Sequence, residues 1–106
     1  MAERKMPGAI DRERWAKLSF IEQMGNISSE VGRAINARDN PARRDAAIDR
    51  ALDLFSATAV CCSGLRLREL LRARDEFLNL FFGDSTDYDG IARYFHYFAL
   101  AARRHC

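Results

Sequence analysis

The sequence has few prolines and no long apolar run. The 106 residues include two prolines, and 48% of them are hydrophobic and 30% charged. This composition is typical of one globular domain. No stretch approaches the roughly 20 apolar residues that cross a bilayer. The charged start Met1-Ala2-Glu3-Arg4-Lys5 also lacks the apolar segment of a secretion signal. We therefore expect a cytoplasmic protein with no membrane segment.

Cysteine is scarce as well. The sequence has three cysteines, and two of them, Cys61 and Cys62, are adjacent. An odd count does not suit a disulfide framework, and neighbouring cysteines bridge only with strain. The sequence therefore predicts free thiols that pack as small hydrophobic residues in a reducing compartment.

Patterns that carry catalysis or bind metal are also missing. The histidines His96 and His105 accompany no cysteine nucleophile, zinc-ligand spacing or glycine-rich phosphate loop. The acidic loop at 83–90 resembles a calcium loop only superficially. An EF-hand needs glutamate at its twelfth position, and counted from Ser85 that position is His96. We expect no enzyme, no metal and no cofactor, with catalysis by His96 as the alternative.

Apolar residues recur at helical intervals in four segments, and no segment alternates as a strand does. In the first segment, Phe20, Met24, Ile27, Val31 and Ile35 fall three or four residues apart and share one face. Short connections between such helices favour antiparallel neighbours. The sequence thus predicts one all-α domain over residues 1–106, an antiparallel up-down-up-down four-helix bundle with helices at about 12–38, 41–62, 65–82 and 87–104.

Two irregularities interrupt the apolar stripes. Gly25 and Gly32 lie mid-helix, where each costs about 1 kcal/mol relative to alanine, so close packing against a neighbouring helix or against a partner is expected there. Arg74 falls inside the apolar stripe of the third helix, where a buried and unpaired charge is prohibitive. It must reach an edge, pair with a carboxylate or face an interface. We predict an interface that includes Arg74, Gly25, Gly32 and Tyr97.

Arginine dominates the basic residues and indicates phosphate as a ligand. Of the 17 basic side chains, 15 are arginine, whose planar guanidinium forms paired hydrogen bonds with phosphate. Acidic residues at positions 45, 49 and 53 form a stripe along the predicted second helix. We expect this stripe to be solvated or to meet arginines of a partner. The alternative for the arginines is a solvated surface with internal pairs such as Arg72 with Glu76. The predicted nucleic-acid-binding residues are Arg68, Arg72, Arg93, Arg103 and Arg104.

The segment Gln23-Met24-Gly25-Asn26-Ile27-Ser28-Ser29-Glu30-Val31-Gly32-Arg33 supports a resemblance. With the short bundle around it, it resembles the four-helix-bundle proteins of ribosomal RNA intervening sequences and the accessory (Avd-like) proteins of diversity-generating retroelements. The resemblance implies a cyclic homo-oligomer without enzymatic activity that binds RNA or DNA together with a reverse transcriptase. The present sequence is less basic than those families and carries the segment in its first helix.

Two functions follow as expectations. The first is a non-enzymatic, homo-oligomeric accessory protein that binds nucleic acid, a nucleic-acid enzyme such as a reverse transcriptase, or both. The second is a protein-interaction module, antitoxin-like or regulatory, that uses aromatic side chains such as Tyr88, Tyr97 and Phe82 and binds no nucleic acid.

Overall fold

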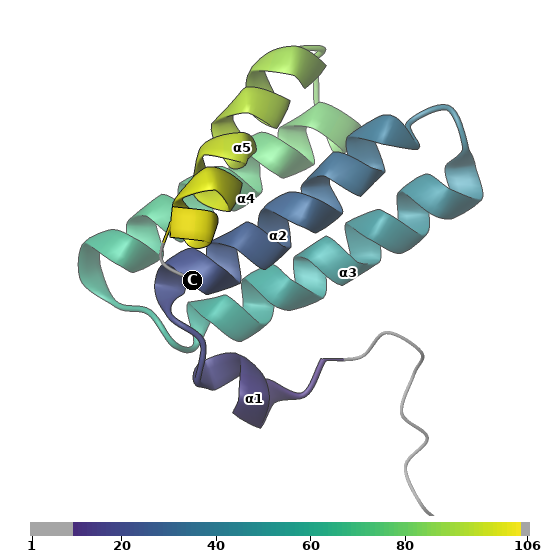
Figure 1. The fold of residues 1–106 in the computed structure, drawn as a ribbon. Coiled ribbons are helices and arrows are strands. Elements are labelled where there is room, and N and C mark those ends of the chain that lie inside the picture. The colour runs from purple at the N-terminus through teal and green to yellow at the C-terminus, as the bar shows by residue number, and fades with distance from the viewer. Residues whose placement is uncertain (1–9, 105–106) are drawn as a thin grey trace, which may run out of the picture.

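The computed structural model describes residues 10–104 (for Arg103 and Arg104, the backbone alone), and this part of the chain is all-α (Figure 1). His105 and Cys106 lie outside it. No helix between residues 10 and 104 is both long and apolar enough to traverse a bilayer. The helices are α1 (Arg12–Ala16), α2 (Phe20–Asn36), α3 (Pro41–Ala59), α4 (Gly64–Phe82) and α5 (Tyr88–Arg104).

The predicted first helix at 12–38 is wrong in one respect, because the chain breaks at residues 17–19 into α1 and α2. Ser19 is the N-cap of α2. Its hydroxyl accepts a hydrogen bond from the Glu22 amide at 3.1 Å, and the Glu22 carboxylate accepts one from the Ser19 amide at 3.0 Å. The hydrogen bond from the Ser19 amide, together with the nearby Ser19 hydroxyl, lowers the pKa of the Glu22 carboxyl. This capping box, Ser-x-x-Glu, can be recognised in the sequence as a signal for the start of a helix. The other three helices agree with their predicted bounds within three residues.

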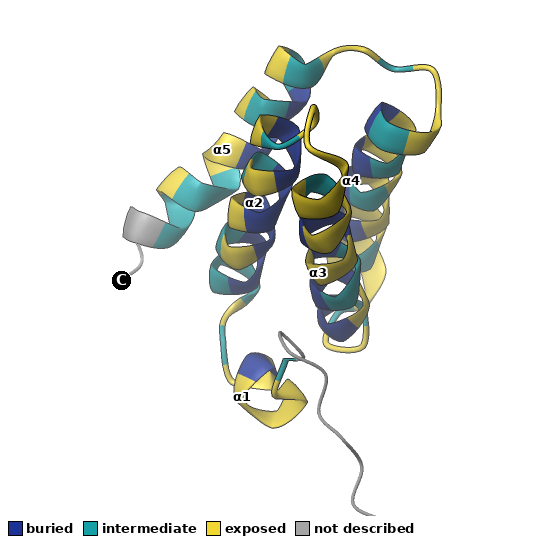
Figure 2. Ribbon diagram, turned by 90° about the vertical axis from the view of Figure 1, so that its right-hand side faces the viewer, coloured by how far each residue is buried: buried dark blue, intermediate teal, exposed yellow. Residues whose placement is uncertain are grey.

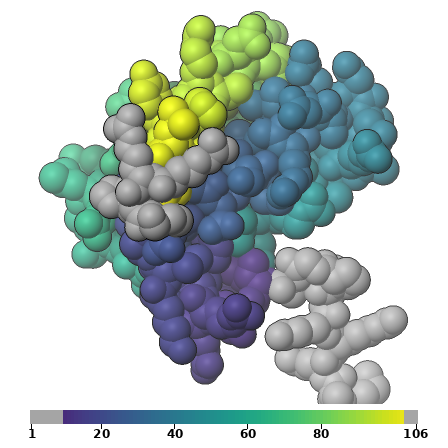
Figure 3. Space-filling view, in the orientation of Figure 1, coloured from purple at the N-terminus to yellow at the C-terminus, as the bar shows by residue number. Residues whose placement is uncertain are grey.

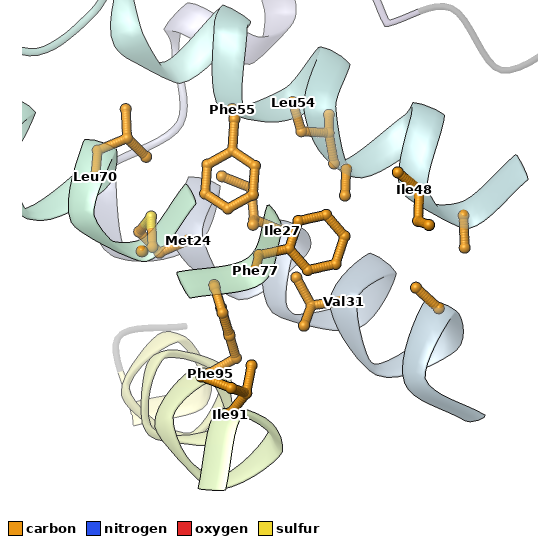
Figure 4. Packing of buried hydrophobic residues seen from close by; sticks show 14 of the residues in the cluster. Met24, Ile27, Val31, Ile48, Leu54, Phe55, Leu70, Phe77, Ile91 and Phe95 are labelled. Carbon is orange, nitrogen blue, oxygen red and sulfur yellow. The ribbon is translucent and has the colours of Figure 1, made fainter. Parts of the chain in front are cut away.

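Helix α2 lies between α3 and α5 and makes most of the close interhelical contacts (Figures 1 and 2). It buries one face completely, because apolar residues recur along it every three or four positions. Three phenyl rings tie the other long helices to this face. Phe55 of α3 lies 6.0 Å from Phe77 of α4 and 6.3 Å from Phe95 of α5, between ring centroids (Figure 4).

The short helix α1 is fastened below this core by buried hydrogen bonds. The indole Nε1 of Trp15 donates to the Thr58 hydroxyl at 2.9 Å, and the Gln23 side-chain amide donates to the Trp15 carbonyl at 2.9 Å. An exposed ion pair between Arg12 and Asp53, 3.3 Å apart, adds to them. Because a buried polar atom without a partner is costly, these bonds fix the angle at which α1 meets α3.

The core line of α4 differs from the predicted stripe. The buried residues are Leu70, Ala73, Phe77 and Leu80. Arg74, which falls inside the predicted apolar stripe, is only half-buried, and Leu71 is exposed. The helix is rotated so that the small Ala73, rather than Arg74, meets the core, which removes the cost of burying an unpaired charge.

The two mid-helix glycines of α2 have different surroundings. A Cβ built on Gly25 would lie 2.7 Å from Cβ of Ala102 on α5, so the missing side chain lets the two helices approach. A Cβ on Gly32 would meet nothing within 4 Å. Gly25 therefore serves packing inside the chain, whereas the surface above Gly32 is open.

This difference predicts opposite effects of the same substitution. Gly32→Ala should stabilise the protein by about 0.5–1 kcal/mol, because alanine is the better helix former and meets no obstacle. Gly25→Ala should destabilise it by about 1–2 kcal/mol, because the clash with Ala102 outweighs that gain. Urea unfolding of both variants measures the difference. Equal stabilisation by both would contradict the close contact between α2 and α5.

Candidate nucleic-acid interface

The predicted arginines lie on two separate helices. Arg68 and Arg72 are exposed on α4, and Arg93 is exposed on α5. Arg103 and Arg104 belong to the last turn of α5, and their side chains lie outside the described part of the structure. Of the predicted interface residues, Tyr97 is 74% exposed on α5.

Arg72 has an acidic residue one turn before it and another one turn after it on α4, Glu69 and Glu76. Tyr94 of α5 faces this part of α4, and its pKa is raised by burial of the hydroxyl and by the carboxylates of Glu69 and Glu76, against the opposing effect of Arg72. The negative charges of these two carboxylates thus partly offset the positive charge of Arg72. The outer face of α4 is of mixed sign, which weakens its case as a phosphate-binding surface.

A basic groove lies elsewhere, where α2 ends and α3 begins. It has a volume of about 590 Å³, and its charged lining consists of Arg33 from α2, Arg43 and Arg50 from α3, and Asp39 from the connecting turn. Asn40 caps α3 at this place by accepting a hydrogen bond from the Arg43 amide at 3.3 Å. The cap and Pro41 at the first helical position start α3 here. Arg43 and Arg50 are therefore both helical, and their spacing of seven residues places them on one face of α3.

A second groove adjoins the first between α2 and α5. It has a volume of about 530 Å³ and is lined by Arg93 and His96 of α5 together with residues of α2. Arg33 and Asn36 line both grooves, so the two grooves are neighbours on either side of this part of α2. Figure 3 shows α2 and α5 side by side on this face, with the turn into α3 at its edge. We call these four arginines, Arg33, Arg43, Arg50 and Arg93, the arginine surface.

The buried carboxylate of Glu30 pairs with two of the four arginines of the arginine surface. The Glu30 side chain is only 9% exposed, and its Oε2 accepts a hydrogen bond from Nε of Arg50 at 2.6 Å while its Oε1 pairs with Arg33. A buried carboxylate needs such partners to offset its lost hydration. Both guanidinium groups remain part-exposed, so Glu30 holds them in place and leaves N–H donors free toward solvent.

The arginine surface carries an excess of positive charge. Four arginines against the two nearby carboxylates, Glu30 and Asp39, leave +2, which equals the formal net charge of the whole chain. The remaining basic and acidic residues balance. The chain is therefore close to neutral overall, but the charged side chains around these two grooves have a net positive charge, which attracts anions.

Sequence reasoning missed three of these four arginines. The helical spacing of Glu30 to Arg33 and of Arg43 to Arg50 was a usable signal, since each pair shares a helix face. What the sequence does not show is that α2 and α3 turn these faces toward each other. No family model, curated protein or solved structure matches the chain.

The Glu30–Arg50 pair should contribute measurably to stability. A double-mutant cycle with Glu30→Ala and Arg50→Ala, followed by urea unfolding, should give a coupling of about 1–2 kcal/mol, because the carboxylate is buried. The exposed pair of Arg44 with Asp45, 3.0 Å apart, is the matched control. Its coupling should stay below about 0.5 kcal/mol. Similar couplings in both cycles would show that Glu30 does not organise the site.

Proposed function

We propose that this protein is a non-enzymatic accessory protein that binds the phosphate backbone of a nucleic acid through the arginine surface. The observation that carries the proposal is the convergence of Arg33, Arg43, Arg50 and Arg93 from three helices on two adjoining grooves. Guanidinium groups recognise phosphate by paired hydrogen bonds, and phosphate contacts dominate the affinity of proteins for nucleic acids.

The arginine surface replaces the outer face of α4 as the centre of the proposed contact. Arg93 is common to this surface and to the residues predicted from the sequence, and Arg103 and Arg104 follow it on α5. Arg68 and Arg72 keep at most a peripheral part, because Glu69 and Glu76 lie one helical turn from Arg72 on α4. A nucleic-acid enzyme such as a reverse transcriptase is the proposed partner, on the strength of the sequence resemblance alone.

The proposal includes two statements about architecture. Helices α2 to α5 form an antiparallel up-down-up-down four-helix bundle, which the short turns between them support. The protein also assembles as a homo-oligomer. In support of assembly, the surface carries large apolar side chains that a monomer leaves in water, among them Leu65 at 80% and Phe82 at 71% exposed.

Charge reversal tests the nucleic-acid contact. Binding of a labelled 20-nucleotide mixed-sequence RNA or DNA, followed by fluorescence anisotropy at low salt, should weaken at least about tenfold in Arg43→Glu/Arg93→Glu, because two phosphate contacts become repulsive. The logarithm of affinity should fall with the logarithm of salt concentration with a slope of about −3 for four contacts to a single strand.

The matched control reverses the same amount of charge on α4. Arg68→Glu/Arg72→Glu should change affinity less than about threefold, since the net charge of the chain changes equally but the grooves are untouched. A larger loss in this control than in the groove variant would move the contact to α4. Absence of salt-dependent binding by the unmodified protein would end the nucleic-acid proposal.

Light scattering tests the assembly. Nuclease-treated protein should show one defined mass above that of the monomer, and Leu65→Ser/Tyr97→Ser should shift it toward the monomer, because exposed apolar and aromatic side chains anchor interfaces. Arg68→Gln, an exposed polar change, should leave the mass unaltered. A monomer at every concentration would contradict the assembly.

A protein-interaction module is the second candidate function. The favouring observation is that Phe82 and Tyr97 are both more than two thirds exposed, while Tyr88 packs against Phe81 and beneath Arg38. Aromatic side chains of this kind are typical anchors of a partner protein. Stoichiometric recovery of one protein in a pull-down that nuclease does not affect, together with a monomer that ignores nucleic acid, would favour this function.

A further inference from the structure

The groove between α2 and α5 differs in character from the one between α2 and α3. Only two of its lining residues are arginines, Arg33 on the α2 side and Arg93 on the α5 side. Between them the walls are built of small residues, among them Gly32, Ala92 and Ala99. The groove, with a volume of about 530 Å³, therefore has room for a flat group as well as for a phosphate.

Gly32 marks the open part of this groove. Apart from its chain neighbours and the backbone of its own helix, no atom in the described part of the chain lies within 4 Å of the position that a Cβ of Gly32 would take, whereas Gly25, two turns earlier on the same helix, is pressed against Ala102. Helix α5 thus covers the position of Gly25 closely, whereas no side chain that the structure describes covers Gly32. Because glycine weakens a helix, its presence beside open space needs a reason other than packing within the chain.

An aromatic, hydrogen-bonding side chain stands at the edge of this space. His96 lies one turn after Arg93 on α5, is exposed, and lines the groove. Its ring can stack on a nucleobase, as histidine does in proteins that bind single strands. Across the groove stands Asn36, which is exposed and whose amide makes no hydrogen bond to any residue that the structure describes. An asparagine amide offers a donor and an acceptor to the edge of a base.

We propose that the α2–α5 groove receives an unstacked base of a single-stranded nucleic acid beside His96, while Arg33 and Arg93 hold the phosphates on either side. The inference rests on the proposed function and narrows its ligand. A duplex presents only its phosphates to a surface of this kind, because its bases are paired and stacked inside. A single strand can turn a base into the groove and satisfy both the ring and the arginines.

The decisive variant fills the groove without touching a charge. Gly32→Phe places a ring in the open space that surrounds Gly32, and Gly32→Ala is its matched control, since a single methyl group leaves the groove passable. Binding is measured by anisotropy with labelled 20-nucleotide oligo(U) and oligo(dT), and with a duplex of the same length. Circular dichroism and urea unfolding establish that each variant is folded.

The unmodified protein should bind the single strands at least about tenfold more tightly than the duplex, because a stacked base contributes to affinity beyond the phosphates. Gly32→Phe should remove about tenfold of that affinity and leave duplex binding unchanged, and Gly32→Ala should change neither. His96→Ala should weaken single-strand binding several-fold, whereas His96→Phe, which keeps a flat ring, should retain most of it. A preference between oligo(U) and oligo(dT) would then separate RNA from DNA as the ligand.

The outcomes distinguish the inference from the proposed function. Equal affinity for duplex and single strand, with no effect of Gly32→Phe or His96→Ala, overturns the base-binding groove and leaves the phosphate-binding proposal standing. Failure of every nucleic acid to bind at low salt overturns both. If Gly32→Phe does not fold, His96→Ala against His96→Phe decides the question alone.

Discussion

Burial of one face of α2 is the constraint on which the rest of this structure depends. Met24, Ile27 and Val31 are fully buried there, between α3 and α5. Burying side chains of this size contributes roughly 1.5–3 kcal/mol each, more than any exposed ion pair of the molecule. Because α2 must be covered on both flanks, α3 and α5 lie on opposite sides of it. This packing also determines where the solvent-facing surfaces of α3 and α5 lie.

The edges of that buried face are polar, and they shape the candidate site. Glu30 stands at the margin of α2, where it is nearly closed off from water but within reach of Arg50 on α3. The packing of α2 on α3 therefore both buries a carboxylate and supplies the cation that it needs. The same carboxylate orients Arg33 toward the adjoining groove. The packing of α2 on α3 therefore also determines where Arg33 and Arg50 of the arginine surface lie.

Close approach at one end of α2 and open space at the other follow from where glycine and alanine meet. Gly25 against Ala102 allows the backbones of α2 and α5 to come together. Farther along, a groove lies between the two helices, and its lining includes the polar residues Ser29, Asn36 and His96. A chain whose net charge is only +2 thus concentrates its excess positive charge around a hollow. A count of charges over the whole sequence cannot show such concentration.

The sequence by itself determined three of the five helices, because apolar residues three and four apart and the Asn40-Pro41 start of α3 are local signals. The break between α1 and α2 was missed, although the capping box at Ser19 is a local signal as well. The sequence could not determine how each helix is rotated about its axis. That rotation places Ala73 rather than Arg74 in the core and separates the surroundings of Gly25 and Gly32. Only tertiary packing decides it, since it depends on which side chains of neighbouring helices fit together. The arginines that line the two grooves come from three helices, and no spacing along the chain reveals that they meet.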